Sequence, residues 1–132
     1  MGRYGCPARA ALASILFSVV AGLAGAPAGA QPEPSFRSTC ANLRAALATL
    51  SPTPEDYITI EVVGRLEEIH SDGILVYMLM CTPPEPRVLC VTYSKGERKV
   101  GDQAILTGTY NDHGPDHVML DPCLHHTEEG PP

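Results

Sequence analysis

The first thirty residues have the pattern of a secretory signal peptide, which leaves the folded part of the chain to the residues that follow. Arg3 and Arg9 carry the positive charges, residues 10–26 form an uncharged apolar run, and residues 28–30 match a signal-peptidase site. A membrane-spanning helix needs about 20 apolar residues, and this run is shorter and rich in Ala and Gly. We therefore expect residues 1–30 to be removed, leaving a periplasmic or secreted chain with no stable membrane anchor.

Four cysteines remain after the leader, and this even number predicts two disulfides in an oxidising compartment. They are Cys40, Cys81, Cys90 and Cys123, and they allow three pairings. None of them forms a C-x-x-C motif, which argues against a thioredoxin-like redox centre or a zinc ribbon. About 100 residues make one domain, and each disulfide would contribute roughly 2–4 kcal/mol to its stability.

The charge of the predicted mature chain argues against nucleic acid as a partner. The formal net charge of −6 becomes −8 once Arg3 and Arg9 are removed, because all fifteen acidic residues lie after the leader. Binding to a polyanion relies on clustered Lys and Arg. The basic cluster of Lys95, Arg98 and Lys99 has Glu97 within it, and we interpret it as a solvated loop.

A short amphipathic helix is predicted ahead of a series of strands. Residues 31–35 are a Pro-rich leader, and residues 40–50 have apolar side chains at helical spacing on one face, namely Cys40, Leu43, Leu47 and Leu50. Ser38 or Thr39 can cap this helix, and the prolines at 52 and 54 end it. We therefore assign residues 31–56 to a linker and an N-terminal helix.

Five strands are predicted after the helix. They cover residues 57–69, 74–81, 87–93, 103–110 and 117–124, with turn signals between them. Gly64 suggests a bulge or bend in the first strand. The second is nearly continuously apolar, as in a strand covered on both faces, and Pro122 interrupts the fifth. The pattern predicts a mainly β fold, a small five-stranded barrel over residues 57–126, with a flexible tail at 127–132. A five-stranded sandwich or meander is the alternative.

Several short motifs resemble a known family. Val63-Gly64-Arg65-Leu66 in the first strand, the Gly101-Asp102 turn before a fourth strand that contains Gly108, and Cys123 near the end of the fifth carry the likeness. Over residues 57–124 the chain resembles exported bacterial OB-fold domains of the tRNA-anticodon-binding-like type. The chain departs from them in placing a helix before the first strand and leaving almost no room for one between the third and fourth. The resemblance implies a binding scaffold.

The resemblance also bears on the disulfides and on a ligand surface. In such a barrel the third and fifth strands are neighbours, which implies Cys90 with Cys123 and Cys40 with Cys81. The competing pairing joins Cys81 to Cys90 across the Pro-rich hairpin and Cys40 to Cys123. OB-folds commonly bind ligands on strands two and three, and the candidate ligand-binding residues there are Tyr77, Arg87 and Tyr93.

The histidines are the alternative site. His113, His117, His125 and His126 lie among aspartates near the last strand, and imidazole with carboxylate can bind zinc, copper or nickel. No H-E-x-x-H or G-x-S-x-G motif is present. We therefore predict a small binding module with no catalytic residues and no cofactor, whose partner is a protein or a small ligand. Metal binding and a minor hydrolytic activity are the alternatives.

Overall fold

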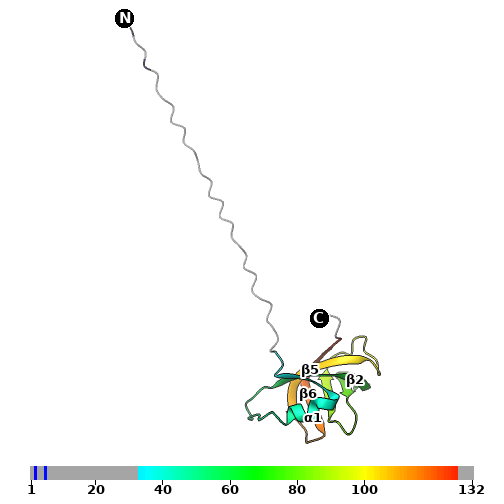
Figure 1. Ribbon diagram of the computed structural model, residues 1–132. Helices are drawn as coiled ribbons and strands as arrows, with labels where there is room; N and C mark the ends of the chain where they lie inside the picture. The colour runs from blue at the N-terminus through cyan, green and yellow to red at the C-terminus, as the bar shows by residue number, and fades with distance from the viewer. Residues whose placement is uncertain (1, 3–4, 6–32, 128–132) are drawn as a thin grey trace. The chain divides into compact units, whose positions relative to one another are not determined.

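A computed structural model describes residues 2, 5 and 33–127, so the predicted signal peptide and most of the tail lie outside the description. Seven elements follow one another along the chain (Figure 1). They are β1 (Phe36–Thr39), α1 (Cys40–Leu47), β2 (Thr59–Ser71), β3 (Val76–Met80), β4 (Arg87–Thr92), β5 (Gln103–Asp112) and β6 (His117–His126).

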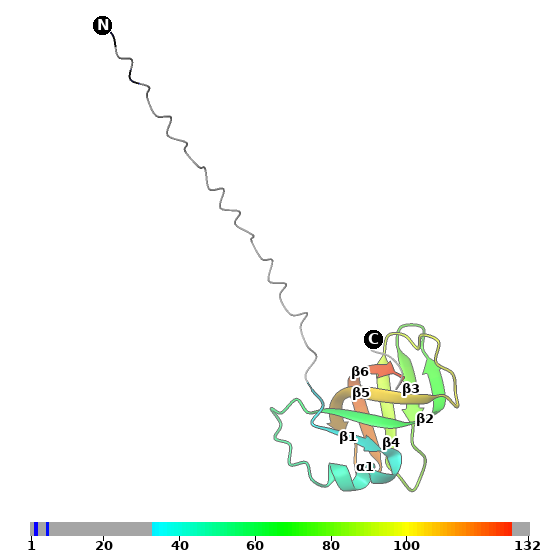
Figure 2. The same cartoon turned by 45° about the horizontal axis from the view of Figure 1, so that its top comes forward.

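Five of the strands close into a barrel, which confirms the predicted fold class. The strand order is β1-β2-β3-β4-β6-β5, and a further pairing of β2 with β5 closes the sheet. Closure is possible because β2 is 13 residues long, so that its first half pairs with β5 and its second half pairs with β3. β4 and β6 are parallel neighbours. The chain is therefore a small, mainly β, OB-like barrel with one short helix (Figure 2).

The barrel interior is filled by alternate residues of the strands, as expected when successive side chains point to opposite faces. The fully buried members are Ile60, Val62, Leu66, Met78, Met80, Val88, Cys90, Leu106 and Leu120. Leu43 of α1 is also fully buried, and Cys40 and Leu47 pack against the same core. The predicted apolar face of the helix therefore covers part of the barrel core. β3 alternates between buried and partly exposed residues, so the expectation that both of its faces are covered is wrong.

The N-terminal part of the fold differs from the prediction in two places. β1 lies within the predicted linker and pairs in parallel with residues 60–63 of β2. It was missed because its sequence, Phe-Arg-Ser-Thr, has a single apolar residue and no alternation. The helix ends at Leu47 rather than Leu50, because Thr49 and Leu50 donate to carbonyls three residues earlier, in a tighter turn. Thr39 occupies the N-cap position without a side-chain capping bond.

The last strand continues beyond the predicted break at Pro122. Asp121–Pro122 is a cis peptide bond, and the register between β5 and β6 shifts at this point, so that the ladder accommodates the proline. Residues 123–126 then pair with residues 105–108 of β5. His125 and His126 therefore belong to β6, which ends two residues beyond the predicted end of the fifth strand at residue 124.

Gly64 has a different role from the predicted one. The irregularity in β2 lies between Leu66 and Glu68, not at Gly64. A Cβ atom on Gly64 would lie 2.8 Å from Cys40 Sγ and 3.0 Å from Met80 Cγ. Glycine is required here because the helix disulfide packs directly against the strand backbone.

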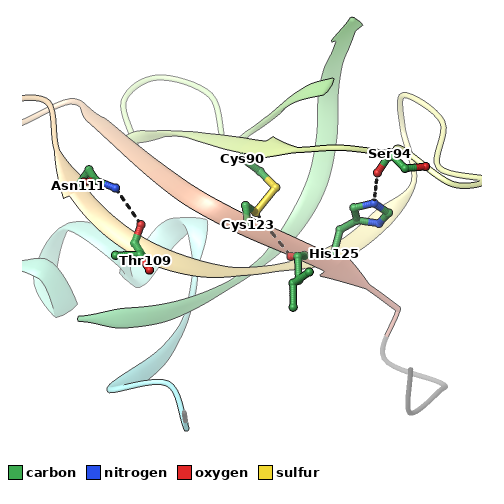
Figure 3. The surroundings of a disulfide bond; sticks show 7 residues. Cys90, Ser94, Thr109, Asn111, Cys123 and His125 are labelled. Carbon is green, nitrogen blue, oxygen red and sulfur yellow. Dashed lines mark hydrogen bonds between the residues drawn. A yellow bond between two sulfur atoms is a disulfide. The ribbon is translucent and has the colours of Figure 1, made fainter. Parts of the chain in front are cut away.

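The two disulfides join Cys40 to Cys81 and Cys90 to Cys123, each with a Cα–Cα distance of 5.4 Å. This is the pairing that the family resemblance implies, and the alternative across the Pro-rich hairpin does not form. The first bond attaches the start of α1 to the residue after β3. The second joins the parallel neighbours β4 and β6 inside the barrel (Figure 3). Two disulfides in so small a fold indicate a non-reducing, extracellular-type environment.

Candidate functional site

The outer face of β3 and β4 brings together the residues that were predicted to bind a ligand. Tyr77 pairs with Val91, and Leu79 pairs with Leu89, so these four partly exposed side chains lie next to one another outside the barrel. Tyr93 follows β4 in the same alternation and is 82% exposed. We refer to Tyr77, Leu79, Arg87, Leu89, Val91 and Tyr93 as the outer face.

Tyr77 is held by the neighbouring hairpin turn. Its hydroxyl donates a hydrogen bond of 2.8 Å to Asp72 Oδ2, while Asp72 Oδ1 accepts from the backbone N–H groups of Ile74 and Leu75. These bonds lower the pKa of Asp72, with the Leu75 N–H as the largest cause, and the bond to Asp72 raises the pKa of Tyr77. Because its hydroxyl is engaged, Tyr77 offers its ring rather than its oxygen to a ligand.

Arg87 lies at the opposite end of the outer face from Tyr93. Six residues separate the two along an extended chain, or about 20 Å. Arg87 Nη2 lies 3.7 Å from Glu68 Oε2, and its buried Nε has no hydrogen-bond partner among the residues that the structure describes. The predicted ligand residues thus share one strip of surface along β3 and β4, and Arg87 at one end of it also lines a hollow of about 550 Å³.

The four histidines of the alternative site do not converge. His113 and His117 lie at the start of β6, where the His113 N–H donates to the His117 carbonyl, and His125 and His126 lie at its other end. His125 Nε2 is 2.6 Å from the carbonyl oxygen of Ser94 (Figure 3). Across residues 33–127, no three His, Cys, Asp or Glu side chains are placed to hold a metal ion together.

Arg44 organises the end of the barrel below α1, a role that the sequence did not indicate. Its guanidinium donates to the carbonyls of Pro115 and Pro84 and to Asp116 Oδ1, at 2.7–2.8 Å. One helix residue therefore ties the β3–β4 and β5–β6 connections together. Hollows of about 410 and 550 Å³ flank it. Because the donors of Arg44 are engaged by the protein itself, we assign it a structural role.

Comparison with known proteins adds no family to this description. No model of a known protein family matches the chain, and no curated protein matches it either. In the part of the chain that the structure describes, no helix has the length and apolar character needed to cross a membrane.

Proposed function

We propose that this chain is a periplasmic or secreted, non-catalytic binding module that binds a protein or small ligand on the outer face of β3 and β4. The single observation that carries the proposal is the strip of partly exposed aromatic and aliphatic side chains on β3 and β4, which ends at the exposed Tyr93. Its side chains point away from a barrel core that is already filled without them. Aromatic rings presented on a rigid sheet are an effective stacking surface, because little conformational entropy is lost when they bind.

The family resemblance supports the same assignment. OB-folds commonly use the strands that correspond to β3 and β4 for binding, and the acidic charge of the chain disfavours nucleic acid as the ligand. The predicted export signal and the two disulfides together favour action outside the cytoplasm. The intact mass of the exported protein tests this part. We expect a chain that begins at Gln31 and has no free thiol.

Binding is tested on the exported, oxidised protein with a panel of short peptides and oligosaccharides, followed by NMR of the backbone amides. We expect a bound ligand to shift the amide signals of Tyr77, Leu89 and Val91. Tyr93→Ala should lower the affinity for that ligand about tenfold, since stacking on one aromatic ring contributes about 1–3 kcal/mol.

Tyr57→Ala is the matched control. Tyr57 is 91% exposed, and it precedes the part of β2 that pairs with β1 and β5 rather than with β3. This variant should bind like the original chain. If no member of the panel shifts the outer-face signals, or if the two tyrosine variants lose affinity equally, the outer face is not the binding surface.

A further inference from the structure

A hollow of about 300 Å³ lies between the β2–β3 hairpin and the connection from β4 to β5. In Figure 2 these two segments lie side by side, away from α1. Its lining residues are Ile69, His70, Ser71, Val76, Lys95, Arg98, Lys99 and Val100. We call it the basic hollow. None of its lining residues belongs to the outer face, although its His70 pairs with Tyr77, with ring centroids 6.4 Å apart, so the two surfaces are adjacent.

The connection that carries the cations is an ordered structure. Arg98 N–H donates to the Lys95 carbonyl, and Asp102 N–H donates to the Lys99 carbonyl, each at 3.1 Å. Asp102 Oδ2 in turn accepts from the Lys99 backbone N–H at 2.9 Å. Arg65 of β2 fastens the end of the connection by donating to the Gly101 carbonyl. The side chains of Lys95, Arg98 and Lys99 therefore extend from a backbone segment that two successive turns hold in place.

The cations of the basic hollow have no carboxylate partner among the described residues, unlike three of the arginines elsewhere in the fold. Arg37, Arg44 and Arg87 each form an ion pair, with Glu61, Asp116 and Glu68 respectively. Among the described residues, Lys95, Arg98 and Lys99 form no ion pair, although the chain has a large excess of acidic residues.

Arg98 is held partly inside the fold, since its Nε is buried within the described part of the chain. An anion bound in the basic hollow would offset the mutual repulsion of the three cations.

The remaining lining of the basic hollow is largely apolar. Ile69 and Val76 come from the hairpin, and Val100, which is 61% exposed, comes from the connection. Exposed apolar carbon next to unpaired cations is complementary to a ligand with an anionic head and an apolar body. The volume lies at the lower end of the range for small-molecule sites, about 300–1,000 Å³.

We propose that the basic hollow binds a small organic anion, in which a phosphate or carboxylate group is attached to an apolar body. Lys95, Arg98 and Lys99 contact the anionic group, and Ile69, Val76 and Val100 contact the apolar body. The same chemistry occurs in free organic phosphates and carboxylates and in the head region of anionic lipids. This site extends the proposed function and does not depend on it.

The test titrates hexyl phosphate into the exported, oxidised protein and follows the backbone amides by NMR. A ligand of this size should bind with a dissociation constant of about 1 mM and shift the signals of residues 69–71 and 95–100. Lys99→Gln should weaken binding about three- to tenfold, as expected for loss of one charge-assisted contact. Arg37→Gln is the control, because it removes the same charge from a side chain outside the hollow.

Inorganic phosphate and 1-hexanol separate the two parts of the ligand. Each should bind at least about tenfold more weakly than hexyl phosphate, and equal binding of either one overturns the corresponding half of the proposal. Vesicles of phosphatidylglycerol in phosphatidylcholine separate the two sources. Binding to vesicles that Lys99→Gln weakens, without binding of hexyl phosphate, assigns the anion to a lipid. No saturable shift with either probe, or equal losses in Lys99→Gln and Arg37→Gln, overturns the proposal.

Discussion

Removal of either disulfide should cost a large part of the domain's stability, by an amount that follows from the chain length it encloses. Cys90 and Cys123 are 33 residues apart, and Cys40 and Cys81 are 41 apart. The loss of loop-closure entropy in the unfolded chain then contributes about 3.7 and 3.9 kcal/mol respectively at 25 °C. A domain of this size has a total free energy of unfolding of about 5–15 kcal/mol. Each double alanine variant should therefore remain folded but be markedly less stable.

Burial separates the two variants, which are nearly equal in loop entropy. Cys90 and Cys123 are 0% and 3% exposed, whereas in the other pair Cys81 is 3% exposed and Cys40 is only half-buried. Truncating two buried sulfurs leaves a cavity that adds roughly 1 kcal/mol, and truncating one adds about half of that. Cys90→Ala/Cys123→Ala should therefore lose about 4.7 kcal/mol and Cys40→Ala/Cys81→Ala about 4.4 kcal/mol.

Urea unfolding followed by far-ultraviolet circular dichroism measures these losses, with the oxidised original chain as the reference. The m value, which is the slope of the unfolding free energy against urea concentration, should rise in both variants. The reason is that the unfolded chain exposes more surface once a cross-link is removed. A loss of less than about 1 kcal/mol for either pair would show that the entropy argument fails here. The reverse order of the two variants would contradict the burial argument.

Two further predictions concern a glycine and a carboxylate. Gly108→Ala should destabilise the fold by about 3 kcal/mol or more in the same urea assay, because a Cβ would lie 2.5 Å from the backbone oxygen of Pro122; a loss below that of Gly64→Ala would contradict this. Asp72→Asn should lower the melting temperature at neutral pH. Because hydrogen bonds lower the folded-state pKa of Asp72 below 3.8, its stabilisation is present above that value and is lost as the pH falls through the folded pKa. The difference between variant and original should therefore shrink in acid, and a constant difference would show that the carboxylate charge is not responsible.

The strands could be predicted because their signals are local. All five barrel strands begin within two residues of the predicted positions, and β4, β5 and β6 begin at the predicted residues. The face of Leu43 and Leu47 likewise follows from helical spacing alone. β1 could not be predicted in this way, since its four residues include a single apolar side chain and show no alternation.

The candidate sites show the same division. Alternation along β4 was enough to place Arg87 and Tyr93 on a common face once the strand was assigned. The basic hollow was not evident, because Lys95, Arg98 and Lys99 form a site only together with Ile69 and Val76 of the hairpin. The proposed site depends also on the absence of ion pairs from these three cations to described acidic residues. In the sequence, the adjacent Glu97 suggests instead that the cluster is a solvated loop of mixed charge.

By itself, the amino-acid sequence determined that the chain carries a leader-like segment, four cysteines after that segment, one amphipathic helix and five strands bounded by turns. Those properties depend on residues a few positions apart. Only the tertiary structure decided which cysteines pair, that Gly64 makes room for a disulfide, and that unpaired cations line a hollow. Each of these depends on pairings such as β4 with β6 and β2 with β3 and β5, which bring together segments that no short-range pattern relates.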